Sequence, residues 1–169
     1  MADKLYFAYG SNINLEQMDY RCPDATVVGP VVLENYELLF RRGGFATIAP
    51  KEGGRVHGLL WSITPECERS LDLYEGYPRF YGKEMMDVEL DGKTISAMVY
   101  VMTPGQEFGI PSDHYANVIW EGYESAGFDT QVLEDAINHA YELTFRQEQQ
   151  NDSLGQQSLF GFGGWSGIK

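Results

Sequence analysis

The chain has 169 residues, an ordinary length for one domain, and such a chain buries a sizeable core without disulfides or a metal. Its formal net charge of −13 opposes binding to a nucleic-acid backbone, which requires clustered Lys and Arg. No apolar run approaches the roughly twenty residues that a bilayer requires, and no signal peptide precedes the first apolar run. We therefore expect a cytoplasmic protein that binds neither nucleic acid nor membrane.

The cysteines and histidines do not predict a metal site. Cys22 and Cys67 lie far apart without CxxC or CxxH spacing, which excludes a zinc knuckle and a thioredoxin-type redox pair. We expect two reduced, partly buried thiols, although the sequence leaves a disulfide between them open. His57, His114 and His139 are isolated, and the chain has no Walker motif or nucleophile elbow. No metal site is therefore expected.

Runs rich in Val, Leu and aromatic residues, each closed by Gly, Pro or Asn, predict strands. In chain order these strands are residues 4–9, two strands with an irregular join within 25–42, then 45–50, 56–63, 81–90 and 94–102. Asp91–Gly92, between the last two, is the strongest hairpin signal. Strands 56–63 and 94–102 are apolar on both faces, which a sheet curved into a barrel would bury. We predict an α+β fold, a small β-barrel of about six or seven strands with peripheral helices.

Capping residues and apolar periodicity predict the helices. Asn12 or Asn14 caps a helix of about 15–20, Thr64 and Pro65 begin one that Gly76 ends, Ser112 caps about 113–126, and Asp129 caps a last helix to about residue 147. The Gly- and Pro-rich segment 103–111 has the length of a rim or lid over a site. The apolar stripe predicted for the last helix includes Tyr141.

The composition changes after residue 148, passing through Gln-, Asn- and Ser-rich text into an aromatic, Gly-rich end. We predict one domain over residues 1–148 and a C-terminal tail over 149–169, which is flexible or docks in a groove of the same or a neighbouring subunit. A homodimer is one assembly compatible with that docking.

Glu75 stands at the end of a predicted helix, with Tyr74, Tyr77, Phe80 and Tyr81 close in sequence. Burial among aromatic side chains disfavours the charged carboxylate and raises its pKa toward values useful for moving protons near neutral pH. Most glutamates at helix ends are solvated surface residues, so the local sequence by itself favours a surface position.

The loop Tyr9-Gly10-Ser11-Asn12 lies between a predicted strand and the N-terminus of a predicted helix. This position gathers unpaired backbone N–H groups and the positive end of a helix dipole, which suits a bound carboxylate. An ordinary strand-to-helix turn accounts for the same residues, because one glycine is a much weaker signal than a P-loop.

Five motifs, in this order, resemble those of the γ-glutamylcyclotransferase family. They are YFAYGSN at 6–12, GGFATI at 43–48, LDLYEG at 71–76, YVMT at 100–103 and PSDHY at 111–115. The resemblance runs from about Leu5 to the helix after Ser112. Each motif is weak, but five in register are specific.

This resemblance implies a closed or nearly closed mixed β-barrel and a cofactor-free enzyme that releases 5-oxoproline from γ-glutamyl amides. Glu75, in the LDxxEG segment, is implied as the general acid/base. The implied substrate-binding residues are Tyr6, Phe7, Ala8, Tyr9, Gly10, Ser11 and Asn12 for the glutamyl end, with Tyr115 after the Pro-Ser pair. We add Tyr81, from the aromatic group near Glu75, to this set.

The residues of the chain agree with this chemistry, because a γ-glutamyl substrate carries its own nucleophile, the α-amino group. The leaving group is not fixed by these motifs, since the family acts on γ-glutamyl amino acids, amines and larger metabolites. Two other readings stay open. The barrel could hold a glutamyl-like ligand without catalysis, or the protein could be an interaction module that acts through its aromatic tail.

Overall fold

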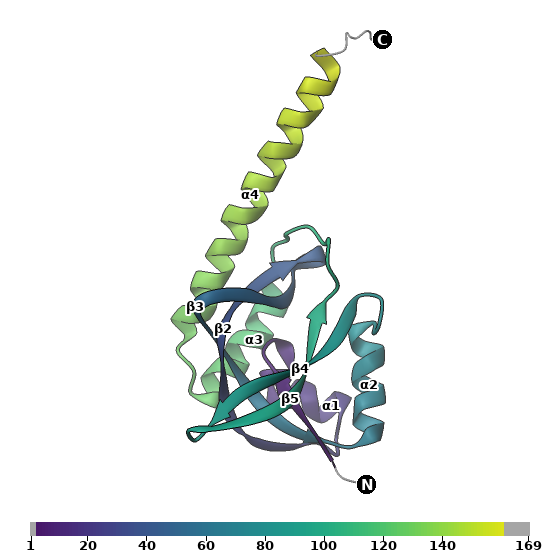
Figure 1. Ribbon diagram of the computed structural model, residues 1–169, viewed down its shortest axis with the longest axis vertical. Coiled ribbons are helices and arrows are strands. Elements are labelled where there is room, and N and C mark those ends of the chain that lie inside the picture. The colour runs from purple at the N-terminus through teal and green to yellow at the C-terminus, as the bar shows by residue number, and fades with distance from the viewer. Residues whose placement is uncertain (1–2, 161–169) are drawn as a thin grey trace.

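Within residues 3–160, which the computed structural model describes, five strands form a closed barrel in the order β1-β3-β2-β4-β5 (Figure 1). The strands are β1 (Lys4–Ala8), β2 (Thr26–Arg41), β3 (Phe45–Ile63), β4 (Tyr81–Leu90) and β5 (Lys93–Met102). Neighbouring strands pair antiparallel, except that β1 and β5 pair in parallel at Tyr6 and Met98 and so close the barrel. The predicted α+β fold and mixed barrel are confirmed.

The barrel has five strands, where six or seven were predicted, because two interruptions fall inside long strands. β2 is continuous across the predicted join and has two register shifts against β3, one near Gly29 and one near Asn35. β3 passes through Pro50 and the predicted polar turn 51–54, which lies opposite the second shift. A bulge bends a strand without ending it, so the turn residues do not divide β3.

The helices within the described part of the chain are α1 (Leu15–Arg21), α2 (Pro65–Glu75), α3 (Asp113–Ala126) and α4 (Thr130–Phe160), with short 3-10 turns η1 (Ser11–Ile13) and η2 (Arg42–Gly44). Asn14, one of the two predicted caps of α1, accepts a hydrogen bond from the Gln17 N–H at 3.2 Å. Thr64 and Ser112 cap α2 and α3 in the same way. These predicted helix starts are confirmed.

α4 is longer than predicted, because it continues past residue 147 to Phe160 and extends away from the barrel (Figure 1). Its buried stripe ends at Ala140, and Tyr141, predicted as part of that stripe, is 53% exposed. The segment beyond has no proline and many Gln and Glu residues with good helix propensity. The division into a domain and a tail at 148/149 stays a prediction, and docking of the aromatic end involves side chains outside those described.

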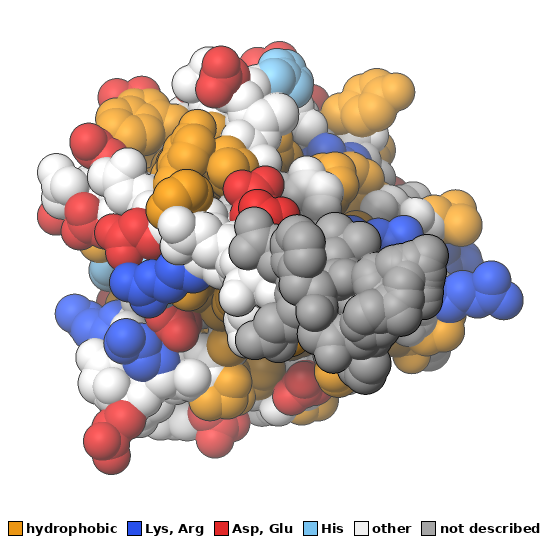
Figure 2. All heavy atoms as spheres, turned by 90° about the horizontal axis from the view of Figure 1, so that it is seen from above, with side chains coloured by type: hydrophobic (Ala, Val, Ile, Leu, Met, Phe, Trp, Pro, Cys, Tyr) orange, Lys and Arg blue, Asp and Glu red, His pale blue; other side chains and the backbone are white. Residues whose placement is uncertain are grey.

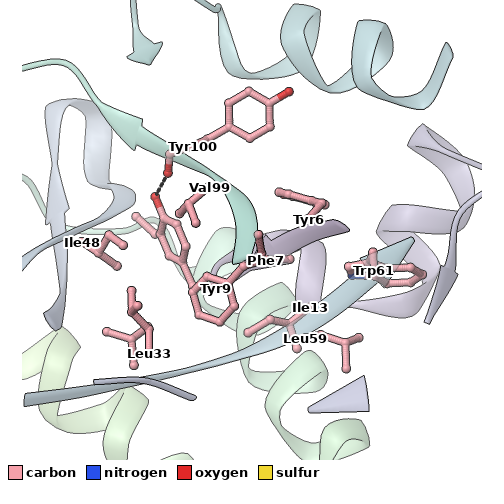
Figure 3. Close-up of a cluster of buried hydrophobic side chains, with 14 of the residues drawn as sticks. Tyr6, Phe7, Tyr9, Ile13, Leu33, Ile48, Leu59, Trp61, Val99 and Tyr100 are labelled. Carbon is pink, nitrogen blue, oxygen red and sulfur yellow. Dashed lines mark hydrogen bonds between the residues drawn. The ribbon is translucent and has the colours of Figure 1, made fainter. Parts of the chain in front are cut away.

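One continuous apolar core fills the barrel and continues beneath α3 and α4. In Figure 3 the rings of Phe7 and Tyr9 lie among aliphatic side chains from several strands. The Tyr9 hydroxyl donates a hydrogen bond of 2.6 Å to the Tyr100 carbonyl, which ties the residue after β1 to β5. Cys22 and Cys67 are buried free thiols in this core, and burial raises the pKa of Cys22 to about 12.

Helix hydropathy, surface charge and metal-ligating side chains of residues 3–160 are relevant to the predicted partners. None of the helices described over residues 3–160 is long and apolar enough to cross a membrane. Acidic side chains are spread over the face seen along α4, with fewer basic ones among them (Figure 2). No group of three His, Cys, Asp or Glu residues in the described part of the chain is placed to hold a metal ion.

Candidate active site

A cavity of about 220 Å³ lies where the loop after β1 meets the end of α2 and the start of α3. Most of its walls are aromatic, and Glu75 is the one carboxyl among its lining residues. The lining consists of Tyr6, Tyr9, Gly10, Ser11, Asn12, Phe45, Ala46, Tyr74, Glu75, Phe80, Tyr81, Tyr100 and Tyr115. An apolar cavity with a few converging polar groups is the usual form of a small-molecule site.

Glu75 is the last residue of α2, and Gly76 ends the helix in the left-handed conformation with φ of 67°. The Gly76 N–H bonds back to the carbonyls of Asp72 and Leu73, so the position of Glu75 is fixed by a complete helix cap. Its half-buried side chain faces the cavity. Within residues 3–160 its carboxylate receives no hydrogen bond and forms no ion pair.

Burial raises the pKa of Glu75 from 4.5 to about 7, and the positive charge of Arg21 opposes part of this rise. Removal from water destabilises the carboxylate more than the neutral acid, and no hydrogen-bond donor offsets that cost. Near neutral pH the side chain therefore populates both protonation states, which a group that accepts and returns a proton requires.

The loop at Gly10 places backbone donors beside the cavity. In η1 the Ile13 N–H bonds to the Gly10 carbonyl and the Asn14 N–H to the Ser11 carbonyl, each at 3.1 Å. The first N–H groups of such a turn, those of Ser11 and Asn12, have no acceptor within it. A Cβ on Gly10 would lie 3.3 Å from the Ala46 Cβ, so the glycine lets the loop approach β3 closely.

Asn12 is buried and held by three hydrogen bonds. Its Nδ2 donates to the Tyr6 hydroxyl at 3.0 Å, its carbonyl accepts from the Trp61 Nε1 at 3.0 Å, and its Oδ1 accepts from Arg21. The Arg21 guanidinium also stacks 3.6 Å from the centroid of the Tyr74 ring. Arg21 thus links the Gly10 loop to the end of α2 from outside the cavity lining.

Two of the tyrosine hydroxyls in the cavity form hydrogen bonds with the backbone of β3. Tyr81 donates to the Ala46 carbonyl, and the Ala46 N–H donates to the Tyr115 hydroxyl at 3.1 Å. Burial raises the pKa of Tyr81 and of Tyr115 above the usual value of 10, so both stay protonated. These two hydroxyls are therefore neutral near pH 7, whereas the carboxyl of Glu75 titrates there.

The structure brings most of the predicted site residues into this cavity. Those that line it are Tyr6, Tyr9, Gly10, Ser11, Asn12, Glu75, Tyr81 and Tyr115. Phe7 and Ala8 are buried in the core and do not line the cavity. Successive side chains of a strand point to opposite faces, so Phe7 points away from the face of Tyr6 and lies against Gly58. No role at the substrate is therefore assigned to their side chains.

Sequence reasoning did not assign a site role to Phe45, Ala46, Tyr74, Phe80, Tyr100 or Arg21. Phe45 and Tyr100 fall inside motifs that carried the family resemblance, so their motifs were a usable signal. Arg21 lies on α1, more than fifty residues from Glu75 in the chain, and reaches the site through Asn12 and the Tyr74 ring. Its place depends on tertiary contacts that no local pattern reports.

The loop 103–111, predicted as a rim or lid, contributes no residue to the cavity lining. Phe108 forms a β-bridge with Arg41, whose guanidinium lies 4.1 Å from the centroid of the Phe108 ring. A Cβ on Gly109 would lie 2.8 Å from the Gly44 nitrogen, so the two backbones are in close contact. The loop therefore supports the η2 turn from outside the cavity.

The described part of the chain is thus a closed mixed barrel with one partly desolvated carboxyl in a tyrosine-lined cavity. Residues 6–118 match the family model described as Gamma-glutamyl cyclotransferase, AIG2-like. The chain belongs to this family, as the sequence motifs predicted.

Curated relatives and a solved structure agree with this assignment. The chain is 31% identical over 142 residues to the Gamma-glutamylcyclotransferase of Homo sapiens, covering 77% of this chain and 75% of the human protein. It is 32% identical over 142 residues to the Mus musculus protein of the same name, with the same coverage of 77% and 75%. A solved Gamma-glutamyl cyclotransferase superposes with a TM-score of 0.73 at 30% identity, over 79% of this chain and 86% of the other.

Proposed function

We propose that this protein cyclises the γ-glutamyl group of a γ-glutamyl amide, releasing 5-oxoproline and an amine or amino acid. The observation that carries the proposal is that one cavity contains both Glu75, with a pKa of about 7, and the backbone donors of the Gly10 loop. Membership of the family and the names of the relatives support the same reaction.

The reaction needs no nucleophile from the protein, because the α-amino group of the glutamyl unit attacks its own γ-carbonyl carbon to close a five-membered ring. The cavity of about 220 Å³ holds the glutamyl unit folded, which brings nitrogen and carbon together. Tyr6, Tyr81 and Tyr115 enclose it and exclude water. Their hydroxyls stay protonated and can donate or accept hydrogen bonds without gaining charge.

Glu75 moves the proton that the ring closure releases. As its carboxylate it accepts a proton from the attacking amine while the new C–N bond forms. As its neutral acid it returns that proton to the departing nitrogen while the amide C–N bond breaks. A pKa of about 7 makes both transfers accessible at neutral pH, which a solvated glutamate near pKa 4.5 would not allow.

The Gly10 loop carries the second role in this proposal. The N–H groups of Ser11 and Asn12 bind either the α-carboxylate of the substrate or the negative charge that develops on the γ-oxygen. Asn12 is held by Tyr6, Trp61 and Arg21, so the loop is ordered before substrate binds. Preorganised donors of this kind lower the barrier because they need no rearrangement during the reaction.

The test is an assay for 5-oxoproline with a panel of γ-glutamyl amino acids and amines. We expect release by the wild type and a loss of at least about 100-fold in kcat for Glu75→Gln, since general acid/base catalysis contributes that much. Near- and far-ultraviolet circular dichroism show whether Glu75→Gln keeps its fold. Equal release by both proteins would contradict the role of Glu75, and binding without release by the wild type would favour a non-catalytic ligand-binding protein.

A cytoplasmic location and a homodimer, both expected from the sequence, stay predictions. Fractionation of cells and light scattering of the purified protein would test them.

A further inference from the structure

A second hollow, of about 340 Å³, adjoins the cavity that contains Glu75. Its lining consists of Arg42, Gly43, Phe45, Arg79 and Phe80. Phe45 and Phe80 also line the cavity, and their rings pack edge to face with centroids 6.0 Å apart. These two rings line both the cavity and the hollow, so the two spaces adjoin at this aromatic pair.

Both arginines are attached to turns that also shape the cavity. Arg79 lies in the turn after α2, where its N–H bonds to the Gly76 carbonyl at 3.0 Å, four residues beyond Glu75. Arg42 begins the η2 turn that leads into Phe45, and its guanidinium lies 5.7 Å from the centroid of the Phe80 ring. The two exposed arginines therefore extend from the turn beside Glu75 and from the turn beside the cavity wall.

Neither arginine side chain has an acidic partner within residues 3–160. The ion pairs of these residues use Lys4, Arg55, Lys83 and Arg146, and neither Arg42 nor Arg79 donates a side-chain hydrogen bond there. This is notable because the chain has 25 acidic residues and 12 Lys and Arg. Two unneutralised guanidinium groups at one hollow make a local positive potential in an otherwise acidic protein, and such a site favours an anionic ligand.

We infer that Arg42 and Arg79 form a subsite for a carboxylate on the departing half of the substrate. The inference rests on the proposed function, because the hollow receives what the glutamyl cavity does not enclose. The guanidinium fork matches a carboxylate in shape and charge. The preferred leaving group is therefore an amino acid or a peptide with a free carboxylate, and a cationic amine is disfavoured by repulsion.

The decisive experiment compares γ-glutamyl-alanine with γ-glutamyl-ethylamide, which differ only in the carboxylate of the leaving group. The ratio of their kcat/KM values is measured by 5-oxoproline release for the wild type, Arg42→Gln, Arg79→Gln and the double variant. We expect the wild type to prefer the alanine substrate and the double variant to lose about tenfold or more of that preference, mainly through KM, with smaller losses in each single variant. Because both substrates are assayed on the same preparation, any unfolded fraction cancels in the ratio.

Lys93→Gln is the matched control, because it removes one exposed positive charge from the β4–β5 hairpin, away from the hollow. Its substrate ratio should equal that of the wild type. Added salt should weaken the wild-type preference and leave that of the double variant unchanged. An unchanged ratio in the double variant, with 5-oxoproline still released, would overturn the subsite and leave the proposed function standing. No release from either substrate by the wild type would overturn both.

Discussion

At the scale of single residues, Glu75 is subject to two opposing effects. Desolvation raises its pKa to about 7, and Arg21 limits the rise. Arg21 is in turn held by Asn12 and by the Tyr74 ring, so the loop proposed to bind substrate also adjusts the acid/base group. In the proposed mechanism, substrate binding and proton transfer are therefore coupled through Arg21, which lies outside the cavity lining.

This coupling predicts a pH profile. We expect kcat/KM to rise with pH through a limb near pH 7 as Glu75 becomes a carboxylate able to accept a proton. Arg21→Gln removes the charge that lowers the pKa of Glu75, so its limb should move to higher pH. Arg69→Gln, on the exposed face of α2, is the control and should leave the limb in place. A limb that stays fixed in Arg21→Gln would contradict the electrostatic role of Arg21.

The same desolvation predicts that Glu75 destabilises the folded protein at neutral pH. Its folded pKa, about 7, exceeds its unfolded value of 4.5, so stability is lost as pH rises from 4.5 through 7. The Glu75→Gln side chain cannot ionise, so at pH 8 its free energy of unfolding should exceed that of the wild type by about 1–3 kcal/mol. This difference is smaller than the full pKa shift would give, because the side chain is partly solvated. Urea unfolding at pH 8 and pH 4 checks this. A difference of equal size at both pH values would show that ionisation is not its cause.

At the scale of elements, the turn after α2 positions residues of both the cavity and the adjoining hollow. Gly76 ends the helix with φ of 67°, and the N–H groups of Arg79 and Phe80 bond to its carbonyl at 3.0 and 2.9 Å. The turn thus fixes Glu75 on one side and places Arg79 and Phe80 on the other. A change in its backbone should affect catalysis as well as stability.

Gly76→Ala tests this against Gly127→Ala. Both glycines end helices at positive φ, 67° and 78°, so each substitution should cost about 1 kcal/mol of unfolding free energy. A Cβ at Gly76 would meet the Phe80 Cβ at 3.1 Å, whereas one at Gly127 meets nothing within 4 Å. We expect 5-oxoproline turnover to fall several-fold for Gly76→Ala alone. Equal turnover losses in the two variants would mean that the turn has no special part in catalysis.

Local signals predicted the elements well and the joins between them poorly. Helix caps such as Asn14 and Thr64 depend on neighbours three residues away, and the sequence displays both partners. β2 and β3 stay continuous because their pairing partners carry them across Gly29 and Pro50, which local turn signals assign to breaks. The cavity residues include some that local signals predicted and some that only tertiary contacts place. Its motifs were recognisable, whereas Arg21 and the shared wall of Phe45 and Phe80 required the folded chain.

At the scale of the whole molecule, α4 has an attached half and an extended half (Figure 1). Leu133 and Ala140 are buried against the barrel, whereas Phe145 and Leu154 are 60% and 58% exposed. Gln147 is the last residue with a described hydrogen bond to the body, where its side chain accepts from the Phe108 N–H at 2.9 Å and donates to the Phe108 carbonyl at 3.2 Å. The helix therefore supports the loop 103–111 up to this residue.

This arrangement predicts different results for two changes in α4. Deleting residues 151–169 removes the extended part of α4 and keeps Gln147. We therefore expect kcat/KM to stay within about twofold of that of the full chain, and the urea midpoint of unfolding to stay within about a few tenths molar. Gln147→Ala leaves the half-buried Phe108 backbone groups without their partner, which should cost about 1 kcal/mol of unfolding free energy.

Hydrogen exchange of the loop 103–111 separates the two effects. Its amides should exchange faster in Gln147→Ala and at the wild-type rate in the deletion, because only the substitution breaks the contact between α4 and Phe108. Phe108 also bridges to Arg41, next to the η2 turn that leads into the cavity wall, so a loosened loop should raise KM more than it lowers kcat. If the deletion abolished turnover or altered the assembly state in light scattering, residues 151–169 would have to reach the site or a second subunit.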